Sequence, residues 1–247
     1  MTDANGGSAT LRVFRGDSSG GAEREYTVHT LPGMVVLDAI NQIQAEQDQT
    51  LAVRWNCKAA RCGSCSAEVN GRPRLLCKAR LDEFAGPIQV HPMKTFPIIR
   101  DLVTDVSFNY EVDRKIQPFT PREQGPFNLR QEDVARVQEF RRCIECFLCQ
   151  DVCHVLREHG QGSAYFGPRY MVRMAALEMH PMDAADRGAQ LHGDAGLAYC
   201  NITKCCEEVC PEHIHITDNA IIPLKERVAD EHYDPLRWAI RRITGKA

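Results

Sequence analysis

The residues with the clearest chemistry in this 247-residue chain are its twelve cysteines. They fall into three groups of four, at 57–77, 143–153 and 200–210. So many cysteines serve either as disulfides in secreted domains or as thiolate metal ligands in a reducing compartment. The first residues, 1–8, have no cationic start and no apolar core of a signal peptide, and they are not arginine-rich. We therefore expect an intracellular, bacterial protein whose cysteines bind metal.

The first cysteine group has the spacing C-x4-C-x2-C-x11-C, which is the plant-type [2Fe–2S] pattern. Gly63 and Ser64 allow the tight turn that three thiolates on one short loop require. A structural zinc site is the alternative, although zinc ribbons usually pair two separated C-x2-C motifs. The expected ligands of the [2Fe–2S] cluster are Cys57, Cys62, Cys65 and Cys77.

The second group has the spacing C-x2-C-x2-C-x3-C of bacterial ferredoxins, with members Cys143, Cys146, Cys149 and Cys153. His154 follows where proline is usual in this run. In two-cluster ferredoxins the fourth cysteine of such a run binds the other cluster. We therefore expect Cys153 to leave its own group, so that another cysteine must replace it.

The third group supplies that replacement but lacks one ligand. Counted back from Cys210-Pro211, the ferredoxin run predicts cysteines at 206, 203 and 200, and position 203 is Thr203. Three thiolates suit a [3Fe–4S] cluster, held here by Cys153, Cys200 and Cys206. Cys210 then completes a [4Fe–4S] cluster with Cys143, Cys146 and Cys149.

This assignment uses eleven cysteines and leaves Cys205 over. Cys205 is either a packed or partly exposed free thiol, a substitute for Cys206, or a fourth ligand that makes the third cluster a cubane. The run spacing favours Cys206 as the ligand, and the sequence leaves the alternatives open.

The first cysteine group needs a scaffold, and the pattern around it predicts a small α+β domain. Residues 11–15 and 25–31 alternate apolar and polar residues around a Gly/Ser-rich turn, which predicts a hairpin. Apolar residues at helical spacing over 35–43 predict a helix, and 67–69 and 88–90 predict further strands. This element order is that of a β-grasp ferredoxin domain, which we place at residues 1–106.

The other two groups lie in a half that is predicted to be all-α and bacterial-ferredoxin-like, at residues 107–247. Apolar faces predict helices at 99–106 and 134–140, and Gly167-Pro168 opens another over 169–180. The second and third cysteine groups are expected on loops between helices. The proline-rich segment 117–126 cannot continue a helix, and the domain junction is expected in or just before it.

Composition excludes several function classes. The net charge of −3 offers no global basic field for nucleic acid, and no stretch approaches the roughly 20 apolar residues of a membrane span. There is no dinucleotide fingerprint, P-loop or defensible nucleophile–base pair. Three different clusters in one chain indicate a path for single electrons, with substrate conversion on a partner.

The chain resembles the iron–sulfur subunit of succinate dehydrogenase and fumarate reductase. The resemblance rests on the interleaved cysteine runs and on segments 54–65, 96–103 and 166–168. It implies a flavoprotein partner with covalent FAD, electron flow through [2Fe–2S], [4Fe–4S] and [3Fe–4S], and delivery to a quinone at a membrane-anchor subunit. It also implies a peripheral location, through that anchor, on the cytoplasmic face of the bacterial membrane.

Several alternatives remain beside this resemblance. The family's usual tryptophans and histidine of the quinone pocket are replaced by segment 154–159 and Asn201, so the quinone is expected mainly at the anchor, or a further redox centre takes the electrons. Segment 236–243 is either a membrane-surface helix or an ordinary packed one. The complex could act as a fumarate reductase, and the chain could also be the cluster subunit of another reductase, a soluble carrier or a zinc-bound interaction protein.

Overall fold

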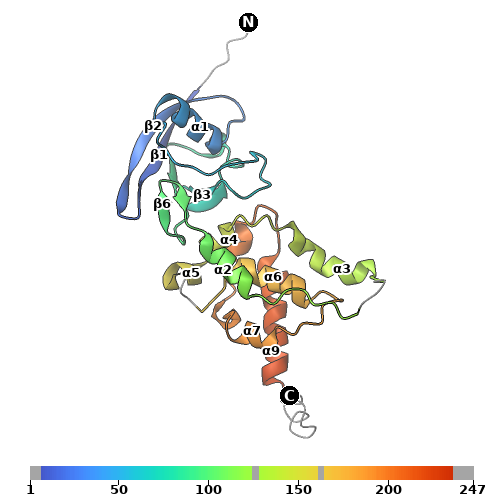
Figure 1. Ribbon diagram of the computed structural model, residues 1–247. Coiled ribbons are helices and arrows are strands. Elements are labelled where there is room, and N and C mark those ends of the chain that lie inside the picture. Colours follow the sequence, from blue (N-terminus) through green and yellow to red (C-terminus); the bar gives the residue numbers. More distant parts are fainter. Residues whose placement is uncertain (1–6, 124–127, 161–163, 236–247) are drawn as a thin grey trace. The chain divides into compact units, whose positions relative to one another are not determined.

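The structure is a computed structural model that describes residues 7–123, 128–160 and 164–235 (Figure 1). The chain forms two compact units that are interleaved in sequence. The first comprises Met1–Phe108, Ile144–Val152 and Val209–Glu212, and the second comprises Asn109–Cys143, Cys153–Glu208 and His213–Ala247. The predicted division into domains 1–106 and 107–247 stays a prediction, because it concerns which parts fold independently.

The first unit is built on a mixed five-stranded sheet. Strands β1 and β2 pair antiparallel from Gly7 opposite Thr30 to Asp17 opposite Gly20, whereas β1 and β5 run parallel. This topology, with one helix between the first hairpin and the later strands, confirms the predicted β-grasp fold. The strand order is β2-β1-β5-β3-β4, with β1 Gly7–Asp17, β2 Gly20–Thr30, β3 Ser66–Val69, β4 Arg72–Leu75 and β5 Ile88–His91.

Helix α1, Val36–Glu46, supplies the apolar face predicted from its spacing. Its core-facing residues Val36, Leu37, Ala39, Ile40 and Ile43 are at most 1% exposed. The strands contribute inward-pointing residues at alternate positions, as a sheet with one covered face requires. Helix and strands share one hydrophobic core, which includes Leu11, Val13, Val28 and Val90.

The predicted helix at 99–106 is wrong. Residues Ile98–Arg100 form β6 and Val103–Thr104 form β7, an antiparallel pair with a turn at Asp101. Asp101 has a φ of 49°, and its buried carboxylate accepts hydrogen bonds from the backbone N–H of Gly16 at 3.0 Å and of Ala52 at 2.8 Å. These long-range hydrogen bonds fix a left-handed turn where local spacing alone favours a helix.

The second unit is helical, as predicted. The expected helix before the second cysteine group is α3, followed by the 3₁₀ turn η2, and the expected helix after Gly167-Pro168 is α6, with Pro168 in its first turn. The main helices are α2 Ser107–Lys115, which begins in the first unit, α3 Gln131–Gln138, α5 His154–His159, α6 Pro168–Glu178, α7 Gly188–His192, the π-helical segment η4 Ile216–Ile221 and α9 Ile222–Tyr233.

The core of this unit lies where α6 packs on η4, which in turn contacts α9. Met171, Met174 and Ala175 of α6 are fully buried, as are Ile221 and Leu224 on the other side. This core holds the start of α5 and the loop before α8, Cys205–Glu208, which carry the third cysteine site described below.

Two sequence predictions fall wholly or partly outside the described residues. The membrane-surface or packed helix at 236–243 lies outside them. Of the junction segment 117–126, residues 117–123 are described and contain no helix, in agreement with their prolines.

Candidate cluster-binding sites

The loop that carries the first cysteine group is folded by left-handed residues. Lys58, Ala60 and Gly63 have φ of 52°, 53° and 68°. These turns direct backbone N–H groups at sulfur. The N–H groups of Ala59 and Arg61 lie 3.4 and 3.3 Å from Cys57 Sγ, and that of Ala60 lies 3.3 Å from Cys77 Sγ.

The four thiols of this group are linked by pairwise interactions. Cys62 interacts with Cys57, and Cys65 interacts with both Cys62 and Cys77. Burial raises the pKa of Cys65, whereas burial at Cys62 is outweighed by hydrogen bonds from Ser64 and the Cys57 backbone, which lower its pKa. N–H donors around sulfur stabilise thiolates, which is the environment an electron-accepting cluster requires.

The first cluster loop is packed tightly against the segment 144–152 of the same unit. A Cβ on Gly63 would lie 2.6 Å from the Cα of Cys146. The Ser66 hydroxyl bridges the two pieces of chain, lying 2.9 Å from the Gly63 carbonyl and 2.8 Å from the Cys146 carbonyl. Glycine at 63 is therefore required by both backbone conformation and space.

The four predicted [4Fe–4S] ligands belong to different units of the chain. Cys146, Cys149 and Cys210 lie in the first unit, and Cys143 lies in the second. Cys146 and Cys149 are buried. Near Cys210, Val209 packs against the hydrophobic core, and the Lys78 ammonium lies 3.2 Å from the Pro211 carbonyl oxygen. The structure thus anchors three of the four predicted [4Fe–4S] ligands on one unit.

The third site is one small cavity in the second unit. Cys153, Cys200 and Cys206, the three predicted [3Fe–4S] ligands, line it together with Thr203. The structure therefore brings together three thiols from separate parts of the chain around the position where the ferredoxin run lacks a cysteine. Cys205 lines the same cavity, and its Sγ lies 3.3 Å from the Thr203 hydroxyl.

The thiols of this cavity are strongly shielded from water. Burial raises the pKa of Cys206 to about 12 and that of Cys153 to about 11, and neighbouring thiolates add to both effects. Backbone N–H groups of Val155 and Leu156, at the start of α5, oppose the shift at Cys153. Buried thiols of this kind ionise when a cation binds them, so the donor set fits iron.

Single-metal sites were the alternative to clusters at these cysteines. Within 7–123, 128–160 and 164–235, no three cysteine, histidine or acidic side chains converge closely enough to hold one ion. Tetrahedral zinc needs four ligands at about 2.0–2.3 Å from one point.

The location of the cysteines differs in part from the expectation that the second and third groups lie on loops. Cys149 lies in the one-turn helix α4, Leu148–Asp151, and Cys205 and Cys206 begin α8. Left-handed residues surround them, including Glu145, Phe147 and Lys204. Two or three residues between successive cysteines span about one helical turn, so these cysteines can lie on one-turn helices as well as on loops.

Two polar residues of the third site were missed by sequence reasoning. Tyr165 is 1% exposed, and burial, together with the thiolates of Cys200 and Cys153, raises its pKa. Thr217 is also buried, with its hydroxyl 3.7 Å from Cys206 Sγ. Neither residue belongs to a cysteine run, so only the packing of α6 and η4 reveals them.

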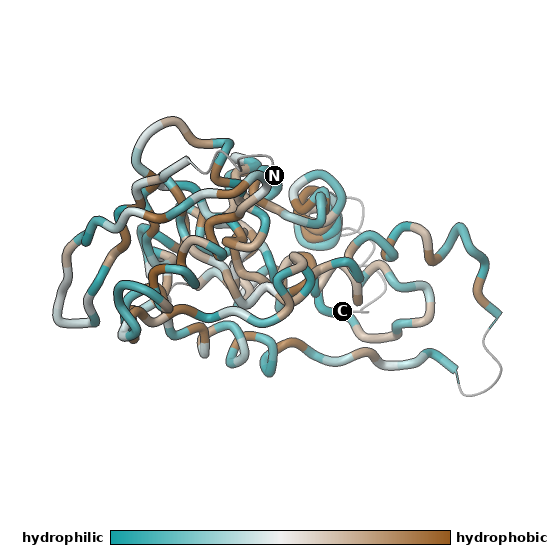
Figure 2. The backbone as a smooth tube through the Cα atoms, turned by 90° about the horizontal axis from the view of Figure 1, so that it is seen from above, coloured by the Kyte–Doolittle hydropathy of each residue, from teal (hydrophilic) through white to brown (hydrophobic). Residues whose placement is uncertain are grey.

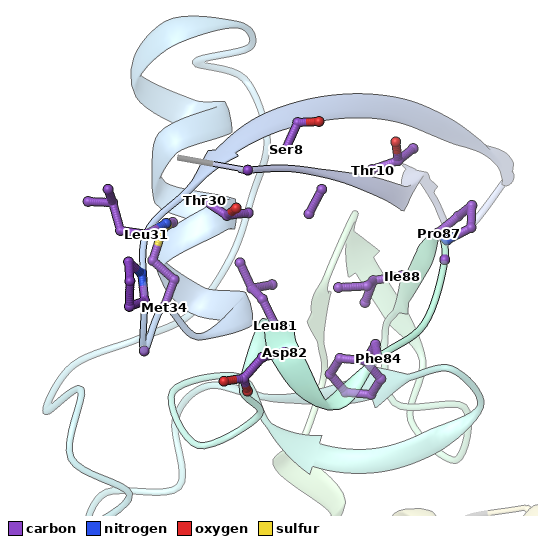
Figure 3. Close-up of a pocket in the computed structure, with 15 residues that line it drawn as sticks. Ser8, Thr10, Thr30, Leu31, Met34, Leu81, Asp82, Phe84, Pro87 and Ile88 are labelled. Carbon is purple, nitrogen blue, oxygen red and sulfur yellow. The ribbon is translucent and has the colours of Figure 1, made fainter. Parts of the chain in front are cut away.

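A separate groove of about 470 Å³ lies at the end of β1 nearest the N-terminus (Figure 3). It is lined by Ser8 and Thr10 of β1, by Leu31 and Met34, and by the short 3₁₀ helix Leu81–Glu83. None of its lining residues within the described ranges is a cysteine. This groove is therefore not a cluster site.

Comparison with known proteins agrees with this geometry. Residues 10–111 match the model of the 2Fe-2S iron-sulfur cluster binding domain, and residues 139–214 match that of the 4Fe-4S dicluster domain. The chain is 29% identical to the succinate dehydrogenase iron-sulfur subunit of Bacillus subtilis, covering 79% of this chain and 82% of that protein. It is 32% identical to the fumarate reductase iron-sulfur subunit of Mycobacterium tuberculosis, covering 76% and 79%.

A solved structure gives the same result at higher similarity. A chain of the Mycobacterium smegmatis Sdh1 complex in the apo form superposes with a TM-score of 0.90. Sequence identity is 58%, and the match covers 93% of this chain and 98% of that chain.

Proposed function

The chain belongs to the family of succinate dehydrogenase and fumarate reductase iron–sulfur subunits, and from this premise we propose that it carries electrons between the FAD of a flavoprotein subunit and a quinone at a membrane anchor. Succinate oxidation is the proposed direction, with fumarate reduction by the same path as the alternative. Conversion of the dicarboxylate takes place on the flavoprotein, and this chain holds the redox centres.

Three clusters are assigned to eleven cysteines. The observation that carries the assignment is the single cavity lined by Cys153, Cys200, Cys206 and Thr203. Each cluster, when bound, accepts one electron at a potential set by its charge, hydrogen bonds and exposure. The proposed ligands are Cys57, Cys62, Cys65 and Cys77 for [2Fe–2S], Cys143, Cys146, Cys149 and Cys210 for [4Fe–4S], and Cys153, Cys200 and Cys206 for [3Fe–4S].

The role of this chain's residues is to hold and tune these centres. Backbone N–H groups at Cys57, Cys77 and Cys153 favour the thiolate form and offset added negative charge on reduction. Burial of Cys153 and Cys206 keeps water from the third site. These contacts set the order in which electrons pass through the chain.

The first site is suited to meet the flavoprotein. Cys57 is exposed, so this edge of the cluster loop is open to a partner. Trp55 is 44% exposed beside it, with the Lys58 ammonium 4.6 Å from its ring centroid. An exposed tryptophan capped by a cation is typical of a protein interface.

The third site is suited to meet the quinone. A cavity of about 270 Å³ is lined by Val155, His159, Ala164 and Tyr199, and Val155 also lines the cluster cavity. The imidazole and the phenol supply hydrogen-bond donors for a quinone carbonyl. The anchor subunit then completes the pocket in place of the family's usual tryptophans.

Association with the membrane is proposed to be peripheral, through the anchor and on the cytoplasmic face. Within the described residues, no helix is long and apolar enough to cross a bilayer. Figure 2 shows hydrophobic and hydrophilic residues mixed along the backbone, without one long hydrophobic stretch.

Low-temperature EPR and iron analysis of the purified complex test the assignment. We expect about nine irons per chain, an oxidised-state three-iron signal that disappears on reduction, and a reduced [2Fe–2S] signal. Added quinone changes the line shape of the three-iron signal.

Two variants test which cysteine binds the third cluster. Cys205→Ala keeps the three-iron signal and Cys206→Ala removes it. A chain without iron, or one that purifies without flavoprotein and anchor, contradicts the proposal.

A further inference from the structure

His154 directly follows the second cysteine run, and its side chain has no role in the assignment above. It is the first residue of α5, directly after Cys153. Its side chain lines the cavity that Cys153, Cys200 and Cys206 share. Its Nε2 atom is buried and has no hydrogen-bond partner among the residues that the structure describes.

A buried ring nitrogen without a partner is costly, so the site must offer it a hydrogen-bond partner when complete. In the tautomer that carries the proton on Nε2, this partner is an acceptor. The three hydroxyls of the cavity already interact with thiols: that of Thr203 lies near Cys205 Sγ, that of Thr217 lies near Cys206 Sγ, and that of Tyr165 is hydrogen-bonded to Cys200. The Lys204 ammonium, also at the cavity, pairs with Asp218. The remaining acceptors are sulfur atoms of the cysteine ligands and of the cluster that they would bind.

Sequence adds an independent argument. Proline commonly follows the last cysteine of the ferredoxin run, and proline is favoured in the first turn of a helix. Proline has no backbone N–H, and its aliphatic side chain carries no hydrogen-bond donor. Histidine at 154 therefore places a donor at a position where the usual residue has none.

We propose that the Nε2–H of His154 donates a hydrogen bond to a sulfur of the three-iron cluster and thereby raises its reduction potential. This inference rests on the proposed [3Fe–4S] site. One electron enters the cluster on reduction, and the proton stays on nitrogen, so no bond is broken. The hydrogen bond is stronger to the reduced, more negative cluster, and it therefore favours reduction.

A potentiometric EPR titration of the intact complex tests the proposal in His154→Phe and His154→Gln. Phenylalanine keeps a ring but lacks the donor, and we expect it to lower the equilibrium constant for reduction about tenfold, which is 59 mV for one electron. Glutamine retains an N–H donor and restores most of the potential. The [2Fe–2S] and [4Fe–4S] potentials of the same samples are the internal controls and stay unchanged.

Pulsed EPR of wild-type complex with ¹⁵N-histidine provides a test that needs no variant. A hydrogen-bonded Nε2 gives a weak coupling to the oxidised cluster, which is lost in His154→Phe. A strong coupling, or four irons at this site, means that nitrogen binds iron and overturns the inference. An unchanged potential in His154→Phe also overturns it. If the wild-type complex has no three-iron signal at all, it is the proposed function that fails.

Discussion

At the scale of single residues, the third site differs from a ferredoxin run because Thr203 is a poor iron ligand. Its hydroxyl lies in the same cavity as three thiols, but it is directed to Cys205 Sγ at 3.3 Å. A neutral hydroxyl is a far weaker iron ligand than a thiolate. In the proposed assignment, a hydroxyl in place of a thiol at position 203 makes this site a three-iron site and not a cubane.

The variant Thr203→Cys tests this directly. A thiol at 203 supplies the fourth ligand, so we expect the oxidised-state three-iron EPR signal to disappear and iron to rise from about nine to about ten per chain. Thr203→Val is the matched control, because it keeps the shape of threonine without adding a ligand and should retain the signal. An unchanged signal in Thr203→Cys contradicts the assigned position of the missing ligand.

At the scale of elements, the cluster loops depend on close approaches of backbone. The first loop meets segment 144–152 at Gly63, where a side chain has no room. The Ser66 hydroxyl then joins the same two pieces of chain. Cluster binding at the first site and packing of the segment that carries Cys146 and Cys149 are therefore linked.

We expect Gly63→Ala to destabilise the first unit by roughly 3 kcal/mol or more, through left-handed backbone strain and overlap with Cys146. The visible absorbance of [2Fe–2S] should fall in parallel. Gly71→Ala is the control: Gly71 also has a positive φ, of 74°, but open space around its Cβ position, so only about 1–2 kcal/mol is lost. Urea titrations of both variants measure the difference, and equal losses contradict the packing argument.

Sequence could predict the elements whose causes are local. The apolar spacing of α1, the alternation in β1 and β2, and Pro168 in the first turn of α6 each act within a few residues. The assignment of individual cysteines to clusters stays a prediction from their spacing, and the cavity lined by Cys153, Cys200 and Cys206 supports it.

The features that sequence missed depend on distant partners. Asp101 ends the run predicted as a helix because its carboxylate binds Gly16 and Ala52, which lie far along the chain. Tyr165 and the buried Nε2 of His154 become significant only when α5 and α6 bring them to the cysteines. No local pattern encodes such contacts.

At the scale of the whole molecule, the first unit includes two segments from the second half of the sequence, Ile144–Val152 and Val209–Glu212. Leu148, from the second cysteine run, is 1% exposed in its hydrophobic core, and Val209 packs against that core. Thr95 adds hydrogen bonds to Asp151, from its N–H at 3.1 Å and from its hydroxyl to the backbone oxygen at 2.9 Å. The boundary of the unit is therefore not a single point in the sequence.

We expect a fragment of residues 1–106 to be less stable than the same unit in the full chain, since it lacks Leu148, Val209 and the partners of Thr95. Burial of one leucine alone contributes about 1.5–3 kcal/mol. The urea midpoint, followed by [2Fe–2S] absorbance, should be lower in the fragment. Leu148→Ala in the full chain is the matched variant and should lose about 2–5 kcal/mol. Equal midpoints for fragment and full chain contradict this expectation.

Because the two units are interleaved, the first unit is completed only late in synthesis on the ribosome. The 104 residues from 109 to 212 follow the first part of this unit, and ribosomes add about 5–20 residues per second. During these roughly 5–20 s, part of the first unit's hydrophobic core, which residues 144–152 and 209–212 cover in the folded chain, stays exposed to water. A chaperone, or early delivery of iron and sulfide to the first loop, has its clearest opportunity during that interval.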